Sequence, residues 1–416
     1  MKILLVTRGS QGDIYPYLAL AKELESRGHC VTLTLPKAFE AAARDSGVHF
    51  LVQAFDDIEG MMSSNSLSTK DFLNWTRRVI VSQFEELIPL LEEHDILVAT
   101  NTEFAAPSVA EYCRKPLIRT TYGPFIPSKV IPPPVMPWPK PHPVFRPALL
   151  WKLLNAGLNL MVLKTLNRRR KELGMEAIRD QAEHAPANSD NYCMYSRYFG
   201  TYDPDWKYQW EIGGYCFNDS FGYDRAALKD FQDFVQKDRR PTLFFTLGSC
   251  NTRERDAFAE RLFDIVCRHD LKLVVGCGWW DVGVHLDRRE NLYLLDTAVP
   301  HSLIFPFCDG IIHHGGVGTS HSAARSGRPQ MIVPLILDQF YWGYRIRQLG
   351  IGPGTANIKR TSYRRLESMV LDLASNESYK KNAAALGERI HGERGLEALC
   401  GHIESYDTEA ARRLDA

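Results

Sequence analysis

A glycine-rich turn with two histidines is the segment of this 416-residue chain whose residue types point most directly to chemistry. The run HHGGVGT occupies positions 313–319, after the apolar residues Ile311 and Ile312 and before a helical pattern. In a strand-to-helix turn, glycines let backbone N–H groups and the positive end of the helix approach a diphosphate closely. A histidine there can donate a hydrogen bond to a phosphate oxygen and, if protonated, offset charge on a leaving diphosphate. Thr319 adds a hydroxyl at the expected helix N-cap, so the segment predicts a diphosphate site, whereas its glycines alone would predict only a tight turn.

An acidic residue and an amide follow the next predicted strand. Asp338 and Gln339 come shortly after Pro334, where they can face the same edge of the sheet as the glycine-rich turn. A carboxylate accepts hydrogen bonds and a carboxamide both accepts and donates them, so the pair suits the vicinal hydroxyl groups of a sugar. The structural alternative is that Asp338 caps a helix beginning at Phe340. Together with the turn, the pair indicates a sugar diphosphate as the ligand.

Asp13 is the candidate for proton transfer. It follows the loop GSQG at positions 9–12. A carboxylate at the edge of a cleft could accept the proton of an acceptor hydroxyl as its oxygen attacks. The structural alternative is a helix N-cap, since Asp13 precedes a helix with Pro16 in its first turn. A lone GSQG is not a G-x-G-x-x-G fingerprint, and the chain has no G-x-x-x-x-G-K-[ST] loop, which argues against a dinucleotide oxidoreductase and a P-loop NTPase.

Two series of alternating strands and helices are expected to position these residues. The first series has predicted strands at 3–7, 30–35 and 96–100, and Gly28 is expected to end its first helix. The second series follows Pro241, with predicted strands at 243–247, 271–275, 292–295, 310–313 and 330–334. This alternation is typical of βαβ units and parallel sheets. The sequence therefore predicts an α/β fold of two facing Rossmann-like, doubly wound domains, with ligands at the carboxyl ends of the strands.

Two segments between these series differ in composition. Prolines crowd residues 122–147, which predicts a long surface loop that could form a wall of a binding site. Residues 148–166 are apolar but are interrupted by Lys152 and Lys164, so they fall short of a membrane span. They could form a face for a lipophilic ligand or for shallow, peripheral membrane contact.

The overall composition excludes several classes of partner. Fifty basic and 50 acidic residues cancel, so no global field favours nucleic acid. Nine scattered cysteines form no C-x-x-C pair and no zinc-like cluster, which favours reduced thiols and a cytoplasmic location and predicts no metal. The apolar run at 3–6 is too short for a signal peptide. Asp203-Pro204-Asp205 spells a D-x-D of the kind that binds metal in other transferases, but it lies in an aromatic loop and is interpreted as structural.

These motifs resemble those of the inverting GT-B glycosyltransferases, which include sterol glucosyltransferases, plant UDP-sugar transferases and antibiotic glycosyltransferases. The matching runs are TRGSQGDIYPYLALAKEL at 7–24, FTLGS at 245–249, VPHSLIFPFCDGIIHHGGVGT at 299–319, AARSGRPQMIVP at 323–334 and DQFYWGYRIRQLGIG from Asp338. The resemblance covers nearly the whole chain and is weakest from Gln53 to Asp190.

The resemblance implies roles for single residues. Asp13 would be the catalytic base, while His314 would contact the donor diphosphate and help the leaving group. The other residues implied in donor binding are Ser249, Val299, Gly316, Gly318, Thr319, Asp338 and Gln339, with Gly12, His301 and His313 as further neighbours. Plant members carry a tryptophan that stacks on uracil where this chain has Ala298, so uridine is only weakly favoured over thymidine.

The resemblance also implies how the chain is divided. Residues 1–215 would bind the acceptor, 216–240 would be a linker, 241–390 would bind the nucleotide sugar, and 391–416 would be a helical tail crossing back to the first domain. The run LNRRRKELGM at 166–175 matches the N-x-x-R-x-x-L-G run of sterol and lipid members.

The implied activity is an inverting, metal-independent and cofactor-free transfer of a hexose. The donor would be a UDP-sugar or a dTDP-sugar, and the acceptor a lipophilic alcohol such as a sterol, carotenoid, hydroxy-lipid or polyketide aglycone. One alternative is a non-catalytic nucleotide-sugar binder, and another is a nucleotide-sugar epimerase of the same architecture. The sequence does not predict an oligomeric state.

Overall fold

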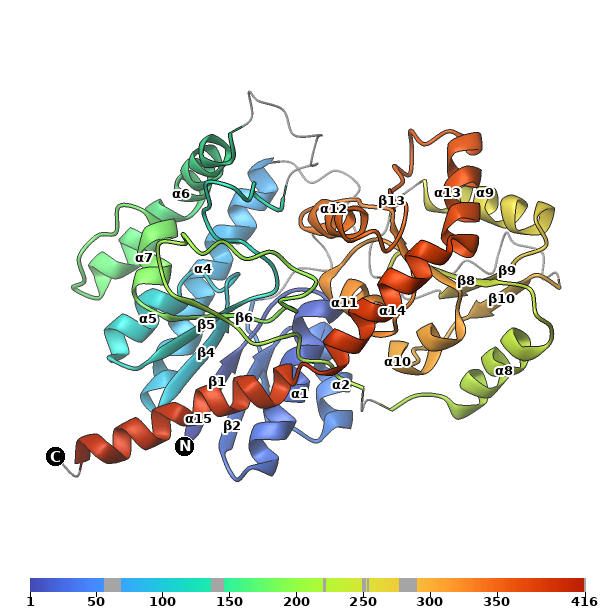
Figure 1. Ribbon diagram of the computed structural model, residues 1–416. Helices are drawn as coiled ribbons and strands as arrows, with labels where there is room; N and C mark the ends of the chain where they lie inside the picture. The colour runs from blue at the N-terminus through green and yellow to red at the C-terminus, as the bar shows by residue number, and fades with distance from the viewer. Residues whose placement is uncertain are drawn as a thin grey trace.

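The computed structural model of the chain describes residues 1–55, 69–135, 146–219, 222–248, 252, 254–276 and 290–414. In these residues two parallel sheets, each flanked by helices, form two domains that lie side by side (Figure 1). The predicted fold of two doubly wound α/β domains is therefore confirmed.

The first sheet has the strand order β3-β2-β1-β4-β5-β6-β7, and all its pairs are parallel. Its strands are β1 (Lys2–Val6), β2 (Cys30–Leu35), β3 (Phe50–Val52), β4 (Ile96–Thr100), β5 (Leu117–Thr121), β6 (Asp190–Cys193) and β7 (Trp210–Ile212). The helices are α1 (Gln11–Ser26), α2 (Glu40–Ser46), α4 (Thr69–Glu92), α5 (Ala106–Cys113), α6 (Pro147–Glu172) and α7 (Gln181–Ala187), with a 3-10 turn at Lys37–Phe39. The central strands β1 and β4 are almost fully buried, as expected for a parallel sheet covered on both faces.

The second sheet is also parallel, with the order β10-β9-β8-β11-β12-β13. Its strands are β8 (Thr242–Thr246), β9 (Lys272–Gly276), β10 (Leu292–Leu295), β11 (Gly310–His313), β12 (Gln330–Ile332) and β13 (Gly354–Thr355). The helices are α8 (Arg225–Gln236), α9 (Arg255–Arg268), α10 (His301–Ile304), α11 (Val317–Arg325), α12 (Gln339–Leu349), α13 (Tyr363–Ser375), α14 (Glu377–His391) and α15 (Gly395–Leu414), with a 3-10 turn at Phe305–Phe307. In both sheets the strands end on the side where the two domains meet (Figure 1).

The segment expected to be a linker, residues 216–240, contains helix α8. Phe231 of this helix is fully buried, and its ring centroid lies 6.2 Å from that of Phe307 and 6.4 Å from that of Tyr293. Helix α8 is thus part of the core of the second domain. The connection between the domains is therefore shorter than the predicted linker. The charged residues that suggested a linker lie on the solvent side of this amphipathic helix.

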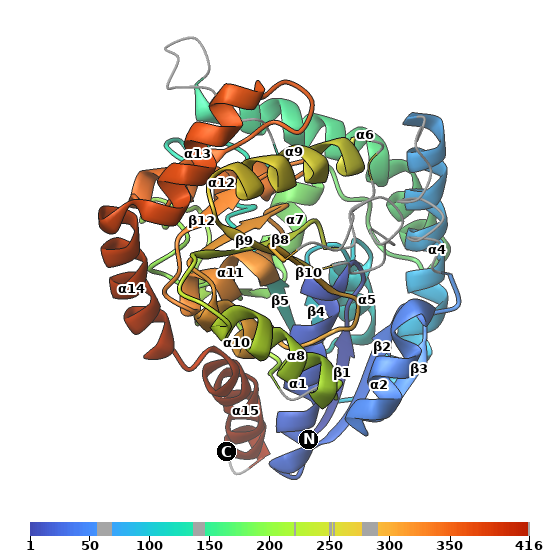
Figure 2. The same cartoon turned by 90° about the vertical axis from the view of Figure 1, so that its right-hand side faces the viewer.

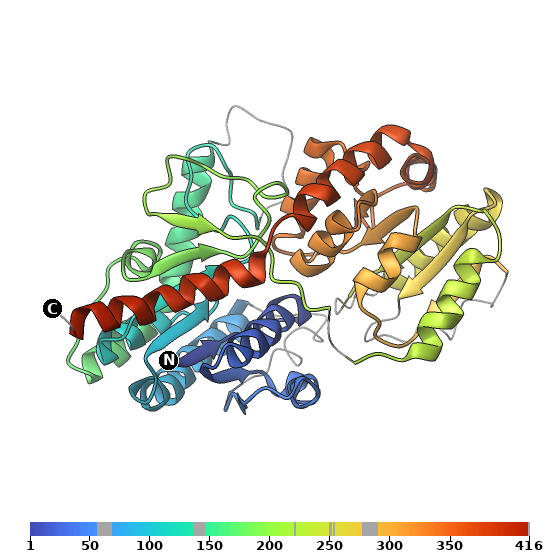
Figure 3. The same cartoon turned by 60° about the horizontal axis from the view of Figure 1, so that its bottom comes forward.

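The last helix, α15, packs against the first domain, while α14 before it packs on the second (Figure 2). His402 and Tyr406 of α15 both bond Asp190 Oδ2 at the start of β6, at 2.6 Å and 2.9 Å. Glu404 contacts His29 of the first domain at 3.2 Å. Figure 3 shows α15 lying along the first domain over its whole length.

The chain leaves the first domain and returns to it at one place. Gly214, just after β7, has a φ of +102°, and its backbone contacts Gly395 at the start of α15. A Cβ on Gly395 would lie 2.6 Å from the carbonyl oxygen of Tyr215. Both positions therefore require glycine, because the two crossing segments touch through their backbones.

The beginning of the proline-rich stretch, residues 122–126, is not a surface loop. Residues Tyr122, Gly123, Pro124 and Ile126 are buried, and the Tyr122 hydroxyl donates to the backbone oxygen of Asp13 at 2.7 Å. The expectation of an exposed loop is wrong for this part because it packs against the domain, whereas Pro127, Lys129 and Val130 are exposed, and residues 136–145 lie outside the described part. Among the described helices, none is long and apolar enough to cross a membrane.

Candidate active site

The turn between β11 and α11 has the predicted strand-glycine-helix form. Gly315 has a φ of +98°, and a Cβ there would lie 2.7 Å from Ile332 Cγ2 and 3.1 Å from the Gln339 backbone oxygen. Only glycine allows the turn to pack this closely on its neighbours. The first hydrogen bond of the helix runs from the N–H of Ser320 to Gly316 O, at 2.9 Å. The N–H groups of the helical residues before Ser320 have no acceptor within the helix. The end of α11 can therefore receive an anion.

Helix α11 begins earlier than predicted. Its N-cap is Gly316 and its first residue is Val317, so Thr319 is the third helical residue and not the N-cap. The prediction placed all glycines in the loop, but glycine is itself an acceptable N-cap, and the helix starts there. The hydroxyl of Thr319 still lies in the first turn.

His314 occupies a narrow space between two glycines. A Cβ on Gly248 would lie 2.7 Å from its Cε1, and one on Gly316 would lie 2.4 Å from its Nε2. The side chain is buried, and Nδ1 has no hydrogen-bond partner among the described residues. Burial, with a contribution from nearby His301, lowers the pKa of His314 to about 4. The ring is thus neutral at neutral pH, so it can act toward a ligand as an N–H donor and not as the cation considered above.

The neighbouring histidines are held by other groups. His313 is fully buried, its Nδ1 accepts the N–H of Gly315 at 3.1 Å, and its Nε2 therefore donates to Gln330 Oε1 at 2.9 Å. His301, at the start of α10, stacks on Phe305 with ring centroids 4.3 Å apart. Of these three histidines, only His314 has a buried ring nitrogen that no described residue bonds.

Asp338 and Gln339 lie at the start of α12. Asp338 occupies the N-cap position, but its Oδ2 accepts from the indole Nε1 of Trp342 at 2.9 Å and does not cap the helix. Burial raises the pKa of Asp338 to about 6, against the effect of this hydrogen bond. Gln339 Oε1 accepts the N–H groups of Leu335 at 2.7 Å and Ile336 at 3.0 Å. Because both lone pairs of this oxygen are occupied, the oxygen orders the loop before Asp338, and sugar binding by Gln339 stays a prediction.

Asp13 is the third residue of α1, whose N-cap is Ser10. Its Oδ2 accepts the N–H of Ser10 at 2.8 Å and the Ser10 hydroxyl at 3.2 Å. Asp13 therefore does stabilise the helix end, but from inside the first turn, and the alternative that it is the N-cap is wrong because the helix starts at Gln11. Burial raises the pKa of Asp13 to about 7; the Ser10 N–H lowers it and the charge of Asp338 raises it. A carboxyl group that titrates near neutrality is suited to proton transfer at that pH.

The two domains meet at these residues. A Cβ on Gly12 would lie 3.6 Å from the backbone nitrogen of Gly318, so the first turns of α1 and α11 are in contact. The Tyr215 hydroxyl, which donates to Gly12 O at 3.3 Å, lies at the same junction, 2.9 Å from the place of a Cβ on Gly318. Asp13 of the first domain is close enough to Asp338 of the second for the charge of Asp338 to raise its pKa. A candidate base, a diphosphate turn and a second carboxylate thus converge at the carboxyl ends of both sheets.

Solved structures share this two-domain arrangement. The calicheamicin glycosyltransferase CalG4 superposes with a TM-score of 0.73 at 17% identity, covering 99% of this chain and 99% of that one. The glycosyltransferase VinC, solved in complex with DTDP, superposes with a TM-score of 0.68 at 17% identity, covering 98% and 100%. At these identities the similarity establishes the fold.

Family models match segments in both domains. Residues 3–125 match the glycosyltransferase family 28 N-terminal domain, and residues 289–393 match the C-terminal domain of erythromycin biosynthesis protein CIII-like proteins. Both domains of the chain are thus similar to glycosyltransferase domains, and their arrangement is the GT-B fold. Among curated GT-B relatives, sterol 3-beta-glucosyltransferase UGT80A2 of Arabidopsis thaliana is 25% identical over 429 residues, which cover 95% of this chain and 64% of that protein. The chain thus spans less than two thirds of the length of this relative.

Two further residues that the GT-B resemblance assigns to the donor can be located only in part. Val299 lies between β10 and α10, with its side chain buried in the core beside Ile304 and Phe305, so only its backbone could meet a base. Ser249 lies outside the described residues.

No metal cluster is found in the described part of this GT-B chain, where no three His, Cys, Asp or Glu side chains are placed to share an ion. Asp203 of the D-x-D run is buried; its Oδ2 accepts the Ser128 hydroxyl at 2.5 Å and its Oδ1 the N–H of Asp205 at 3.0 Å. These contacts give Asp203 a structural role in its loop.

An aromatic cluster that joins the two GT-B domains was not predicted. His321 Nδ1 donates to Val317 O at 2.9 Å, and its Nε2 accepts the N–H of Ser196 in the first domain at 3.1 Å. Tyr215 stacks on the same imidazole with ring centroids 4.8 Å apart. His321 of α11 is thus a direct contact between the domains.

Helix α12 adds to this junction. Trp342 stacks on Phe199 of the first domain, with ring centroids 4.9 Å apart and planes 28° apart. Arg345 donates to the backbone oxygens of Phe199 at 2.7 Å and Gly200 at 3.1 Å. The aromatic composition of both segments was the only sequence signal, since each contact pairs residues more than 140 positions apart.

The run that resembles sterol and lipid GT-B members has a structural role. Asn167 bonds both the N–H and the C=O of Ile178, at 2.8 Å and 2.9 Å. Arg170 is buried and pairs with Glu111 at 2.8 Å. These residues fix the end of α6 and do not reach toward Asp13.

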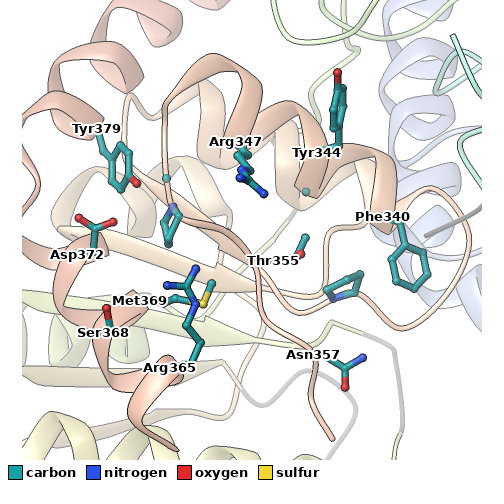
Figure 4. A pocket seen from close by; sticks show the side chains of 14 residues that line it. Phe340, Tyr344, Arg347, Thr355, Asn357, Arg365, Ser368, Met369, Asp372 and Tyr379 are labelled. Carbon is teal, nitrogen blue, oxygen red and sulfur yellow. The ribbon is translucent and has the colours of Figure 1, made fainter. Parts of the chain in front are cut away.

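A hollow of about 590 Å³ lies apart from the converging residues, between α12, β13, α13 and α14 (Figure 4). Arg347 and Arg365 point into it, with Asp372 and Tyr379 on its other side (Figure 4). It contains none of the predicted site residues.

Proposed function

We propose that this protein transfers a hexose from a nucleotide diphosphate sugar to a hydroxyl of a lipophilic acceptor, with inversion at the anomeric carbon. The observation that carries the proposal is the meeting of Asp13, with its raised pKa, and the His314 turn at the junction of the two domains. The first supplies a base and the second a diphosphate site, and both are needed for one displacement.

The donor diphosphate would lie at the N-terminal end of α11. The N–H groups of the first helical turn and the positive end of the helix would bind its oxygens. The buried His314 ring, with a nitrogen that no described residue bonds, would donate a further hydrogen bond. These groups could take the electrostatic role that a metal ion has in other transferases.

Asp338 would accept hydrogen bonds from the sugar hydroxyls. Its carboxylate is oriented by the Trp342 indole, so it is positioned before any ligand arrives. Gln339 would support Asp338 indirectly, because its oxygen holds the backbone of Leu335 and Ile336 in the preceding loop. UDP-glucose is the first donor to test because UGT80A2 is named a glucosyltransferase, and a dTDP-sugar is the second because VinC was solved with DTDP.

In the proposed reaction, Asp13 removes the proton of the acceptor hydroxyl while its oxygen attacks the anomeric carbon. The bond from that carbon to the diphosphate oxygen breaks as the new glycosidic bond forms. The proton ends on Asp13, and the negative charge ends on the diphosphate, beside His314 and the helix end. A lipophilic acceptor is proposed because the name of UGT80A2 states a sterol.

The test is transfer by an Asp13→Ala variant, followed by mass spectrometry with UDP-glucose and a panel of lipophilic alcohols. We expect transfer to fall by about 10²-fold or more, while donor affinity measured by calorimetry stays within about twofold. Asp45→Ala, an exposed aspartate of α2, is the matched control and should keep full activity. Turnover by Asp13→Ala at the control rate would reject the base.

The same assay separates the alternatives. A non-catalytic binder would bind UDP-glucose and neither transfer nor hydrolyse it. An epimerase would convert the sugar nucleotide without any acceptor, which chromatography of the nucleotide pool would reveal.

A further inference from the structure

Helix α6 exposes a stripe of leucines to solvent. Leu149, Leu153 and Leu160 are 52%, 63% and 85% exposed. Their spacings of four and seven residues place them on one side of the helix. Single exposed leucines are common on proteins, but three on one helix face form a contiguous apolar surface.

A neighbouring loop extends this surface. Val130 is 68% exposed, and the adjacent Ile131 accepts a hydrogen bond from the buried Trp151 indole at 2.7 Å. Because Trp151 lies in the second turn of α6, this bond ties the loop that carries Val130 to the start of the helix. We refer to Val130, Leu149, Leu153 and Leu160 together as the α6 face.

Basic side chains continue the same stripe. Lys164, Arg168 and Lys171 are exposed and follow the leucines at helical spacing, while the exposed Lys152 lies between Leu149 and Leu153 in the otherwise apolar half. Residues 146–171 contain seven basic residues and no acidic one. Three carboxylates in the described part of the chain contact these basic residues: Glu172 lies 4.0 Å from Arg168 and 2.9 Å from Arg169, Glu85 of α4 lies 3.3 Å from Arg169, and Glu111 lies 2.8 Å from the buried Arg170. The surface is thus apolar in its first half and cationic in its second half.

We propose that the α6 face docks on the surface of a bilayer that contains anionic lipids. Helices that lie in the membrane interface combine an apolar stripe with lysine and arginine in this way. The leucines would enter the boundary between headgroups and acyl chains, while the lysines and Arg168 would meet the lipid phosphates and carboxylates. Because the stripe is positively charged, it favours an anionic lipid surface as the partner over an acceptor dissolved in water.

The α6 face is connected through the chain to Asp13. Tyr122, which bonds the backbone of Asp13, lies nine residues before Ile131, whose backbone oxygen accepts the indole N–H of Trp151 in α6. Docking of the α6 face would therefore bring the lipid surface to one end of a chain segment whose other end contacts Asp13, the proposed base. This consequence rests on the proposed function, since it assumes that the acceptor is lipophilic, whereas the docking itself does not.

Sedimentation of the full chain with vesicles tests the docking. We expect the chain to bind phosphatidylcholine vesicles that contain phosphatidylserine, and to bind vesicles of phosphatidylcholine alone about tenfold less tightly. Leu153→Gln combined with Leu160→Gln should weaken binding about tenfold or more. Lys164→Gln and Arg168→Gln should each weaken it about fivefold, with the loss disappearing at high salt.

Matched controls lie on other surfaces. Leu51→Gln on β3, where the leucine is 39% exposed, and Lys229→Gln on α8 should bind vesicles as the unaltered chain does. Vesicle binding that is absent, or equal in the leucine variant and the unaltered chain, would overturn the proposal. So would a dimer that the leucine variant converts to a monomer without any vesicle binding, because the face would then join two copies. Transfer of sugar to a water-soluble alcohol, measured in parallel, reports on the proposed function separately.

Discussion

The indole Nε1 of Trp342 donates to Asp338 Oδ2 at 2.9 Å, while the same indole stacks on Phe199 with ring centroids 4.9 Å apart. Asp338 is the carboxylate proposed to hold the donor sugar, and Phe199 belongs to the other domain. The orientation of a sugar-binding group in the second domain is therefore linked, through one side chain, to contact with the first domain.

Replacing Trp342 by Phe should keep most of the ring stacking and remove the N–H donor. Hydrogen bonds to charged groups contribute about 1.5–3 kcal/mol, so we expect the KM for the sugar nucleotide to rise about tenfold or more. The Kd for the nucleoside diphosphate without its sugar should stay unchanged. Tyr341→Phe is the control, because it removes a hydroxyl that contacts Thr201 and leaves Asp338 untouched. Equal weakening of both ligands would show that Trp342 acts only on the fold.

The pH dependence of transfer should follow Asp13. Its pKa is raised to about 7, and the base must be deprotonated, so kcat/KM should fall as the pH drops through about 7. Asp338 contributes to this raised pKa, so Asp338→Asn should move the acidic limb of the profile to lower pH while reducing activity throughout. An unchanged limb in that variant would contradict the coupling of the two carboxyls.

The raised pKa of Asp13 also makes the free energy of unfolding depend on pH, in a direction that can be measured. Between the ordinary pKa of 3.8 and about 7, the folded chain holds a proton on Asp13 that the unfolded chain has lost. The contribution of this group to stability therefore decreases as the pH rises through that range. In Asp13→Asn, the free energy of unfolding measured in urea should decrease less between pH 4 and pH 7 than in the unaltered chain.

Gly316→Ala should displace the His314 ring without unfolding the protein. The added Cβ would lie 2.4 Å from Nε2, which is the end of a side chain that can rotate away. We expect donor affinity to fall about tenfold, the value of one lost hydrogen bond to a charged group, with little change in Tm. Gly222→Ala is the control, since nothing lies within 4 Å of a Cβ there. A large drop in Tm with normal donor affinity would place the role of Gly316 in folding.

His402→Gln should destabilise the protein in a pH-dependent way. Burial of His402 disfavours its charged form, but the carboxylates of Asp190 and Glu211 outweigh this effect and raise its pKa above 6.5. The stabilisation by protonated His402 is complete below pH 6.5, and it is lost as the pH rises through the raised pKa of the folded chain. The unaltered chain should exceed the variant by about 1.5–3 kcal/mol in urea unfolding near pH 6 and by less near pH 9. A difference that does not depend on pH would show that the imidazole is neutral in the folded chain.

The fold could be predicted from the sequence because its signals are local. Strands β2, β4, β10 and β11 have the predicted bounds, since each is a short apolar run between turn residues. The predicted start of α11 came too late in the chain, because Gly316, which the prediction placed in the loop, serves as the N-cap. The linker was overestimated because the charged residues around Phe231 also suit the solvent side of a helix.

The site was predicted by residue type, whereas its geometry depends on contacts between distant segments. Nothing near Gln339 in the sequence shows that its oxygen is taken by the backbone of Leu335 and Ile336. The neutral state of His314 arises from burial beside Gly248, 66 residues earlier in the chain. The junction of His321 with Ser196 joins residues 125 positions apart.

The contact of Gly214 with Gly395 constrains how the two domains can move. Because the outgoing and returning segments touch through their backbones, both chain crossings lie at one point, next to the contacts that α11 and α12 make with the first domain. Sliding of one domain past the other would pull these segments apart, so the low-energy motion is rotation about this pivot. Substrate entry and product release would then open the far side of the interface while Gly214 and Gly395 stay in place.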